Sequence, residues 1–130
     1  MKTELAYLVY VTVLTGLLWV PYILDRIMTG GLMEAVGYPD NPKPQSAWAQ
    51  RLKRAHFNAV ENLVVFATLV LAAGAAGVSN SAVATAAIVY FWARLVHALA
   101  YTFAIPWLRT LAFTAGFLAQ ATIAWQLVMR

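Results

Sequence analysis

The feature that most constrains how this sequence can fold is a stretch near its N-terminus, residues 5–24, in which no side chain is charged. At about 1.5 Å per residue, a helix of this length matches the roughly 30 Å hydrocarbon layer of a bilayer. A cleaved signal peptide is the alternative. However, the stretch is long for the apolar part of such a peptide, and no small-residue cleavage motif follows Pro21-Tyr22. We therefore expect a transmembrane helix here.

Three further apolar stretches are long enough to cross a membrane. They lie at residues 55–78, 82–105 and 110–129. The joints between them, at residues 79–81 and around Pro106, are short, so consecutive helices should be antiparallel neighbours. The predicted fold class is an all-α membrane protein, a single domain over residues 1–130 that forms a four-transmembrane-helix bundle, with helices at residues 5–24, 55–78, 82–105 and 110–129.

Residues 25–54 separate the first two apolar stretches and hold eight of the fourteen charged side chains of the chain. Gly30-Gly31 and three prolines also fall in this segment, which predicts an exposed, turn-rich basic loop. Four crossings place both termini on one side of the membrane and most lysines and arginines on the other. Because the basic side of a membrane protein is normally cytoplasmic, we expect both termini to face the periplasm of a bacterial inner membrane, or the lumen in a eukaryote.

The composition excludes several classes of protein. Hydrophobic residues make up 62% of the chain and charged residues 11%, which is too apolar for the surface of a soluble enzyme. The net charge of +4 is concentrated at one loop, as membrane topology requires, so no nucleic-acid partner is expected. The sequence has no cysteine and no cluster of metal-binding side chains, so thiol chemistry would need a bound thiol and no metal is expected.

Polar side chains inside the apolar stretches form two stripes, each of which lies on one face of a helix because its members are three or four residues apart. The stripes are Arg54, Asn58 and Glu61 in the second stretch, and Arg94, His97 and Tyr101 in the third. A charged side chain inside a bilayer costs at least ~2.5–3.5 kcal/mol on insertion scales, so each of these needs a partner or a function. The helical rise places all of them in the half of the bundle near the basic loop.

Two interpretations of the stripes are open. In the first, Glu61 and Arg94 form a buried ion pair that fixes helix packing. That pair leaves Arg54, and also Arg109 at the start of the fourth stretch, without an acidic partner. In the second interpretation, the surplus of positive charge around a half-buried polar pocket indicates an anionic ligand.

Three segments carry a resemblance to a known family: RAHFNAVE at residues 54–61, RLVHALAY at residues 94–101 and PWLR at residues 106–109. Their order and spacing in a four-span chain resemble the MAPEG family, the membrane-associated proteins of eicosanoid and glutathione metabolism. The resemblance covers nearly the whole chain. It implies a homotrimer of four-helix subunits that holds glutathione, as co-substrate, near the cytoplasmic side and between subunits.

The resemblance also implies roles for individual residues. Arg109 matches the arginine that stabilises the glutathione thiolate in catalytic members of the family. The implied glutathione ligands are Arg26, Arg54, Asn58, Glu61, Arg94, His97 and Tyr101. Phe57 and Asn62 differ from the residues of eicosanoid-forming relatives, which argues against eicosanoid substrates.

The function expected from these observations is that of a membrane glutathione transferase or peroxidase acting on lipophilic electrophiles that arrive from the bilayer. A non-catalytic ligand-binding scaffold of the same family is the main alternative. A small proton-coupled transporter with Glu61 as its working carboxylate is a third. The arginines around Glu61 oppose the transporter because they would repel a cationic cargo.

Overall fold

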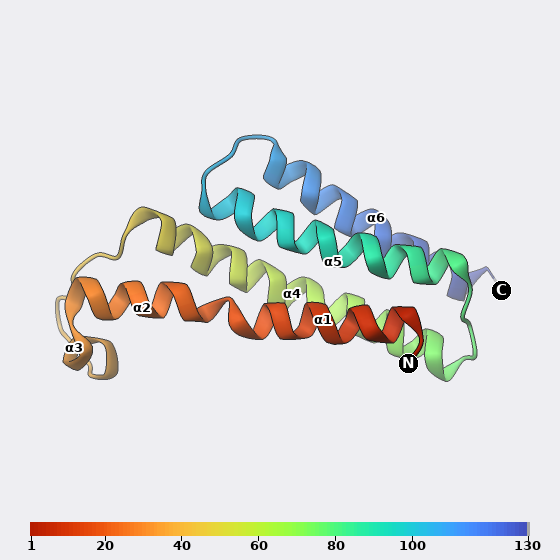
Figure 1. The fold of residues 1–130 in the computed structure, drawn as a ribbon, viewed down its shortest axis with the longest axis horizontal. Helices are drawn as coiled ribbons and strands as arrows, with labels where there is room; N and C mark the ends of the chain where they lie inside the picture. Colours follow the sequence, from red (N-terminus) through yellow and green to blue (C-terminus); the bar gives the residue numbers. More distant parts are fainter. Residues whose placement is uncertain (130) are drawn as a thin grey trace.

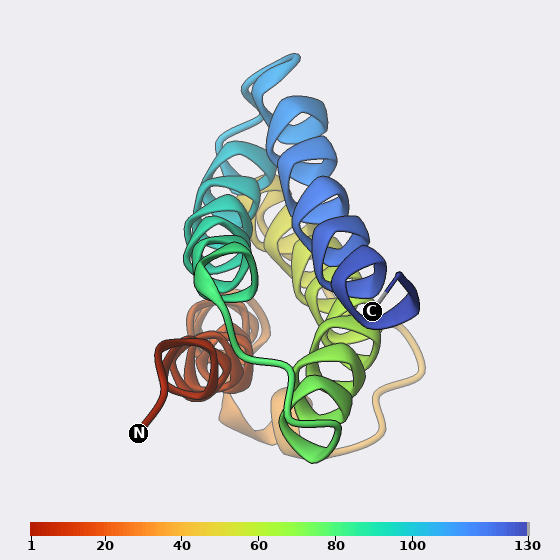
Figure 2. The same ribbon diagram turned by 90° about the vertical axis from the view of Figure 1, so that its right-hand side faces the viewer.

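The computed structural model describes residues 1–129, and within them the chain forms six helices and no strand. The helices are α1 (Thr3–Leu17), α2 (Trp19–Gly30), α3 (Leu32–Val36), α4 (Ala47–Ala75), α5 (Ser81–Thr102) and α6 (Leu108–Val128). Helices α1 and α2 run on in one line, and with α4, α5 and α6 they make an elongated bundle (Figure 1). Seen end-on, these four rods occupy the four corners of the bundle (Figure 2).

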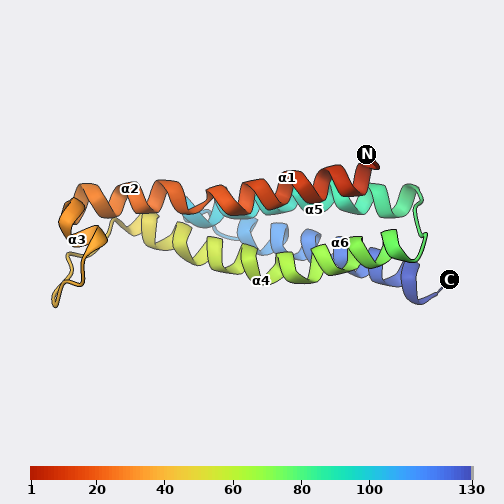
Figure 3. The same ribbon diagram turned by 90° about the horizontal axis from the view of Figure 1, so that it is seen from below.

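Four helical segments are long and apolar enough to cross a membrane. They are Thr3–Gly30, Ala47–Ala75, Ser81–Thr102 and Leu108–Val128. Many large apolar side chains, among them Val13, Trp92 and Phe117, are exposed on the outside of the bundle, where lipid rather than water would cover them. The chain is therefore a multi-pass integral membrane protein, and the prediction of an all-α chain with four membrane-crossing helices is confirmed. Both described ends of the chain lie at the same end of the bundle (Figure 3).

The first crossing is divided at Leu18, between α1 and α2. Pro21 has no backbone N–H, so the carbonyl of Leu17 loses the donor that a regular helix would give it. At the division, the Leu18 N–H bonds to the Thr15 carbonyl at 3.4 Å, three residues back instead of four. The proline thus divides one 28-residue span into two helices without ending it.

The basic loop is shorter than the predicted residues 25–54. Helix α2 continues to Gly30 and α4 begins at Ala47, so most of the charged residues lie on helix ends. The prediction was wrong because loss of hydropathy marks the edge of the bilayer and not the end of a helix. Helix α2 ends at Gly30 and is followed by Gly31, whose φ of 86° favours glycine. For the same reason the second long helix begins at residue 47 and not at 55.

The core of the bundle is built around two aromatic rings. Phe66 of α4 and Tyr90 of α5 stack with ring centroids 3.9 Å apart, and both are fully buried. Val11, Val70, Val83 and Ile123 from the four crossings pack around them. This core lies in the half of the bundle that contains the termini, so the opposite half is left for polar side chains.

Asp25 of α2 joins the first crossing to the second at the basic end. Its buried carboxylate accepts the backbone N–H of Ser46 at 3.0 Å and the Ser46 hydroxyl at 2.5 Å. Ser46 immediately precedes α4, and its own side chain does not cap that helix. A carboxylate from another helix therefore supplies the negative charge that a helix N-terminus favours.

Replacing Asp25 by Asn should destabilise the bundle by about 1–2 kcal/mol, because the amide cannot accept both bonds as an anion does. Thermal unfolding in detergent, followed by circular dichroism, should show a midpoint several degrees below that of the parent protein. Asp40→Asn, at an exposed loop position, is the control and should unfold at the parent temperature. Equal midpoints for the two variants would mean that the Asp25 contact contributes nothing.

Candidate functional site

The two polar stripes meet where α4 packs against α5. The Arg94 guanidinium donates from Nη2 to Asn58 Oδ1 at 2.7 Å. The same nitrogen lies 3.4 Å from Nδ1 of His97, which must be the acceptor because a guanidinium can only donate. Arg94 and His97 are each only 3% exposed. The structure therefore holds a buried cation in place with an amide and an imidazole.

Glu61 is not the partner of Arg94. Its side chain is exposed, as is that of Arg54, so the ion pair considered from the sequence does not form within the chain. The reason is helical geometry: at about 100° per residue, Arg54 and Glu61 lie within about 20° of each other, whereas Asn58 is rotated by about 40–60° from both. The predicted stripe on α4 thus separates into an inward residue, Asn58, and an outward pair.

Half-buried Tyr101 and exposed Arg109 continue this polar group toward the surface of the bundle. The guanidinium of Arg109, near the start of α6, lies over the Tyr101 ring at 4.6 Å from its centroid. The rings of Tyr101 and His97 are in edge contact, with centroids 5.7 Å apart. A cavity of about 200 Å³ opens beside them. It is lined by Asn58, His97, Tyr101, Arg109, Thr110 and Phe113. Four of the eight predicted site residues therefore line the same cavity: Asn58, His97, Tyr101 and Arg109.

A second cavity, of about 230 Å³, adjoins the first and shares Tyr101, Arg109 and Thr110 with it. Its additional polar residue is Arg51, which belongs to the segment predicted as the basic loop, residues 25–54. Arg51 is seven residues before Asn58 and so lies on the same inward face of α4, within about 20°. That spacing was the signal by which the sequence could have identified it. Neither cavity is lined by a carboxylate, which favours an anionic ligand.

The connection between α5 and α6 lines the second cavity and has a strained backbone. Ala104 has a φ of 56° and Trp107 a φ of 69°, in the left-handed region that residues other than glycine seldom adopt. The Leu108 N–H bonds to the Pro106 carbonyl at 2.8 Å, which makes Trp107 the centre of a three-residue γ-turn. This turn sets the direction in which α6 begins and hence the position of Arg109, its second residue.

The polar interior continues from the cavity toward the middle of the membrane. Among residues 1–129, the Tyr90 hydroxyl and Nε of Arg94 are buried without a hydrogen-bond partner. Gln120 of α6 donates to the Asn62 carbonyl of α4 at 3.1 Å. Buried polar atoms left unpaired are costly and uncommon in stable cores. Polar side chains of α4, α5 and α6 thus extend from the cavities into the interior of the bundle.

Arg26, the remaining predicted ligand, is a half-buried residue of α2 and lines neither cavity. The structure does place another residue of the 54–61 segment against α2. Tyr22 and His56 share a hydrogen bond of 2.7 Å between the phenol oxygen and Nδ1. His56 therefore ties α4 to the first crossing, while Asn58, two residues later, points to α5.

Comparison with known proteins gives one positive finding. The sequence model of the MAPEG family matches residues 5–129 of the chain. A search of curated proteins found no match to the chain.

Removing the amide of Asn58 should leave the Arg94 charge without its shortest hydrogen bond. Asn58→Ala should therefore lower the free energy of unfolding by about 2 kcal/mol. Asn58→Asp should be close to the parent, because the carboxylate keeps the acceptor and adds an opposite charge. Thermal unfolding in detergent measures both, with Thr68→Ala on the exposed face of α4 as the control. If Asn58→Ala is as stable as this control, Arg94 does not depend on the amide.

Proposed function

Because the chain belongs to the MAPEG family, which includes glutathione transferases and related proteins, we propose that it binds glutathione and transfers it to lipophilic electrophiles, or uses it to reduce them. One observation carries the proposal. Arg109 faces a cavity that holds polar and aromatic groups but no carboxylate, next to the buried cation Arg94. Such a site suits a ligand with negative charge and a thiol that reacts as an anion.

Glutathione at neutral pH carries two carboxylates, one ammonium group and one thiol. In our proposal Arg109 lies beside the sulfur, where a guanidinium favours thiolate over thiol and so raises the concentration of the nucleophile. The thiol proton passes to water. The thiolate then forms a bond to the electrophilic carbon, and the leaving group departs with the electrons of the broken bond.

The outward pair on α4 would bind the ends of the tripeptide. Arg54 offers a fork to a carboxylate and Glu61 an acceptor for the ammonium group. Arg94, with His97 and Tyr101, would shape the wall, and Arg26 would approach from α2. Holding the tripeptide at several points gives the orientation that makes a bimolecular reaction fast.

The lipophilic substrate can reach the site from the bilayer. A groove of about 420 Å³ between α5 and α6 is lined almost entirely by apolar side chains, including Trp92, Val96 and Leu111. It also contacts Leu108, the residue before Arg109. An apolar electrophile in this groove would lie near the start of α6 without leaving the hydrocarbon layer.

Assembly as a homotrimer is part of the proposal. Glu61 is exposed on a helix that crosses the membrane, and a carboxylate facing lipid costs at least ~2.5 kcal/mol on insertion scales. A second copy packed against the Arg54 and Glu61 face would cover it and bring its own site close. The positive-inside rule supports a cytoplasmic basic end, with the termini on the periplasmic side of a bacterial inner membrane.

A non-catalytic binding scaffold is the second candidate. The contact between Arg109 and Tyr101 favours it. One face of the guanidinium packs on the aromatic ring, so that face is not free to contact a thiolate. The proton-coupled transporter is not supported, because Arg51 and Arg109 line the cavities, Arg94 lies against the cavity residue His97, and these charges would repel a cation. Catalytic turnover separates enzyme from scaffold.

The role of Arg109 can be tested by its replacement. Arg109→Ala should lower single-turnover conjugation of glutathione to an aromatic halide by a factor on the order of 10²–10³, with a much smaller change in glutathione affinity. Arg109→Lys should recover part of the rate, since the charge is kept and the fork is lost. Calorimetry gives the affinity, and ultraviolet absorbance across pH reports the bound thiolate.

Lys43→Ala, at an exposed loop position, is the control for loss of one positive charge at the basic end. If the parent protein binds glutathione without a thiolate signal and Arg109→Ala behaves like it, the protein is a scaffold. If the parent protein does not bind glutathione at all, both readings of the site are wrong.

Glu61→Gln tests the outward face. The variant should bind glutathione roughly tenfold more weakly and form fewer oligomers, because an acceptor for the ammonium group and a contact between copies are both lost. Calorimetry and light scattering measure the two effects. Thr68→Ala, two turns further along the same exposed face, should change neither. Unchanged affinity and assembly in Glu61→Gln would remove Glu61 from the site.

A further inference from the structure

The cavity at Arg51 has a polar wall, of which the glutathione proposal uses Arg109 and Tyr101 but not Arg51. Arg51 donates its Nε–H to the Thr102 carbonyl at 2.9 Å, which fixes the guanidinium against the end of α5. Its two terminal nitrogens, with four N–H donors, form no hydrogen bond within residues 1–129. Across the cavity lies Arg109. Two arginines from different helices thus line one space, and no carboxylate lines it.

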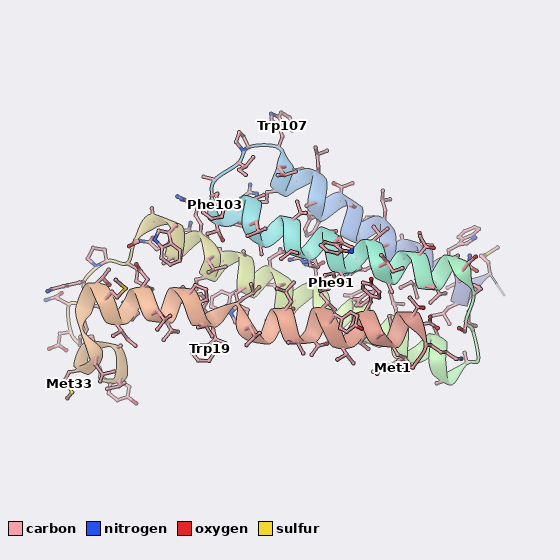
Figure 4. All side chains as sticks on the ribbon, in the orientation of Figure 1. Met1, Trp19, Met33, Phe91, Phe103 and Trp107 are labelled. Carbon is pink, nitrogen blue, oxygen red and sulfur yellow. The ribbon has the colours of Figure 1, made fainter. Side chains whose placement is uncertain are left out.

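The cavity lies at the depth of the lipid head groups. Thr102 is the last residue of α5, so Arg51 marks the level at which that crossing ends. The connection that follows exposes Phe103 and Trp107, which project from the end of α5 and α6 in Figure 4. Exposed aromatic side chains at the end of a crossing are typical of the membrane interface. Ile105, which lines the cavity, is also exposed and would contact the first carbons of an acyl chain.

The strained connection is a second, independent observation at the same place. Ala104 and Trp107 both line the cavity, and both have positive φ. Strain of this kind is typically kept at ligand-binding and catalytic sites, because packing alone would favour a relaxed turn. The cavity therefore has the donors of Arg51 on one side and a strained backbone on the other.

The surrounding charges select the head group. Lys53 and Arg54, both exposed, lie on α4 within one turn of Arg51, so a head group that carries an ammonium ion would be repelled. The planar guanidinium fork matches a phosphate, and basic pockets between transmembrane helices are known to hold anionic lipid head groups. We propose that the cavity between Arg51 and Arg109 binds the phosphate of an anionic phospholipid, with its acyl chains alongside Ile105. The proposal does not depend on glutathione binding.

The test is lipid binding to the purified protein in neutral detergent, measured by native mass spectrometry. The probes are phosphatidylglycerol, phosphatidylcholine and glycerol phosphate, with glutathione measured in parallel by calorimetry. Phosphatidylglycerol should bind at least about tenfold more tightly than phosphatidylcholine, and glycerol phosphate should bind weakly because it has no chains. Arg51→Gln should lower the affinity for phosphatidylglycerol by about tenfold or more. Its amide can still donate to the Thr102 carbonyl.

Lys53→Gln is the matched control. It removes one positive charge from the same end of the same helix, but Lys53 does not line the cavity. Its affinity for phosphatidylglycerol should fall by less than about threefold. An equal loss in the two variants would show a diffuse charge effect and overturn the site. Equal binding of glycerol phosphate and phosphatidylglycerol would identify a soluble phosphate ester as the ligand and overturn the lipid.

Glutathione distinguishes the two proposals. If Arg51→Gln weakens glutathione and not phosphatidylglycerol, Arg51 belongs to the tripeptide site and the lipid site is wrong. If the parent protein binds phosphatidylglycerol selectively but not glutathione, the lipid site stands and the glutathione proposal fails.

Should Arg51→Gln not fold, a variant that leaves Arg51 intact gives the answer. The chain has no native cysteine, so Ile105→Cys offers a single thiol at the cavity mouth. Its modification by a neutral maleimide should be several times slower in vesicles containing phosphatidylglycerol than in phosphatidylcholine alone, because the bound lipid covers it. Equal rates would overturn the proposal.

Discussion

The guanidinium of Arg94 inside a membrane bundle is the constraint on which the basic half of this structure depends. The hydrocarbon layer offers it no hydrogen bonds, so the bundle has to supply acceptors for its terminal nitrogens, while its Nε stays unpaired. Asn58 of α4 provides the closest acceptor and His97 of its own helix the next. Meeting that requirement sets the rotation of α4 against α5, and the rotation in turn decides which residues of α4 face the cavities.

One helix therefore has two functional faces. The inward face of α4 presents Asn58 to Arg94 of α5, and it presents Arg51 to the cavity that it shares with Arg109 of α6. The outward face presents Arg54 and Glu61 to whatever surrounds the bundle. A polar face on a membrane helix is incomplete by itself, because lipid offers no hydrogen bonds. The division explains how one short motif can serve both a site and an assembly.

Much of the fold could be predicted because charge-free runs of residues 5–24 and 110–129 have few alternatives to crossing a membrane. The end of α2 and the start of α4 could not be predicted. They depend on the contact between Asp25 and Ser46, which joins two segments and leaves no local sequence pattern. The burial of Arg94 and His97 followed from their spacing. The ion pair between Arg94 and Glu61 was predicted from their opposite charges and does not form. Glu61 is rotated by about 60° about the axis of α4 from Asn58, the residue that faces Arg94. Arg51 was missed because a cation at a helix end usually remains in water.

The turn between α5 and α6 has a consequence for how this protein can change. Surface connections are ordinarily where insertions and deletions are tolerated. Here the γ-turn at Trp107 determines the starting direction of α6, and Arg109 follows only two residues later. One added or missing residue would rotate Arg109 by about 100° about the helix axis and take it away from Tyr101. The number of residues in this connection thus determines where Arg109 lies relative to the cavity. Substitutions at residues 103–107 should be tolerated better than insertions or deletions there.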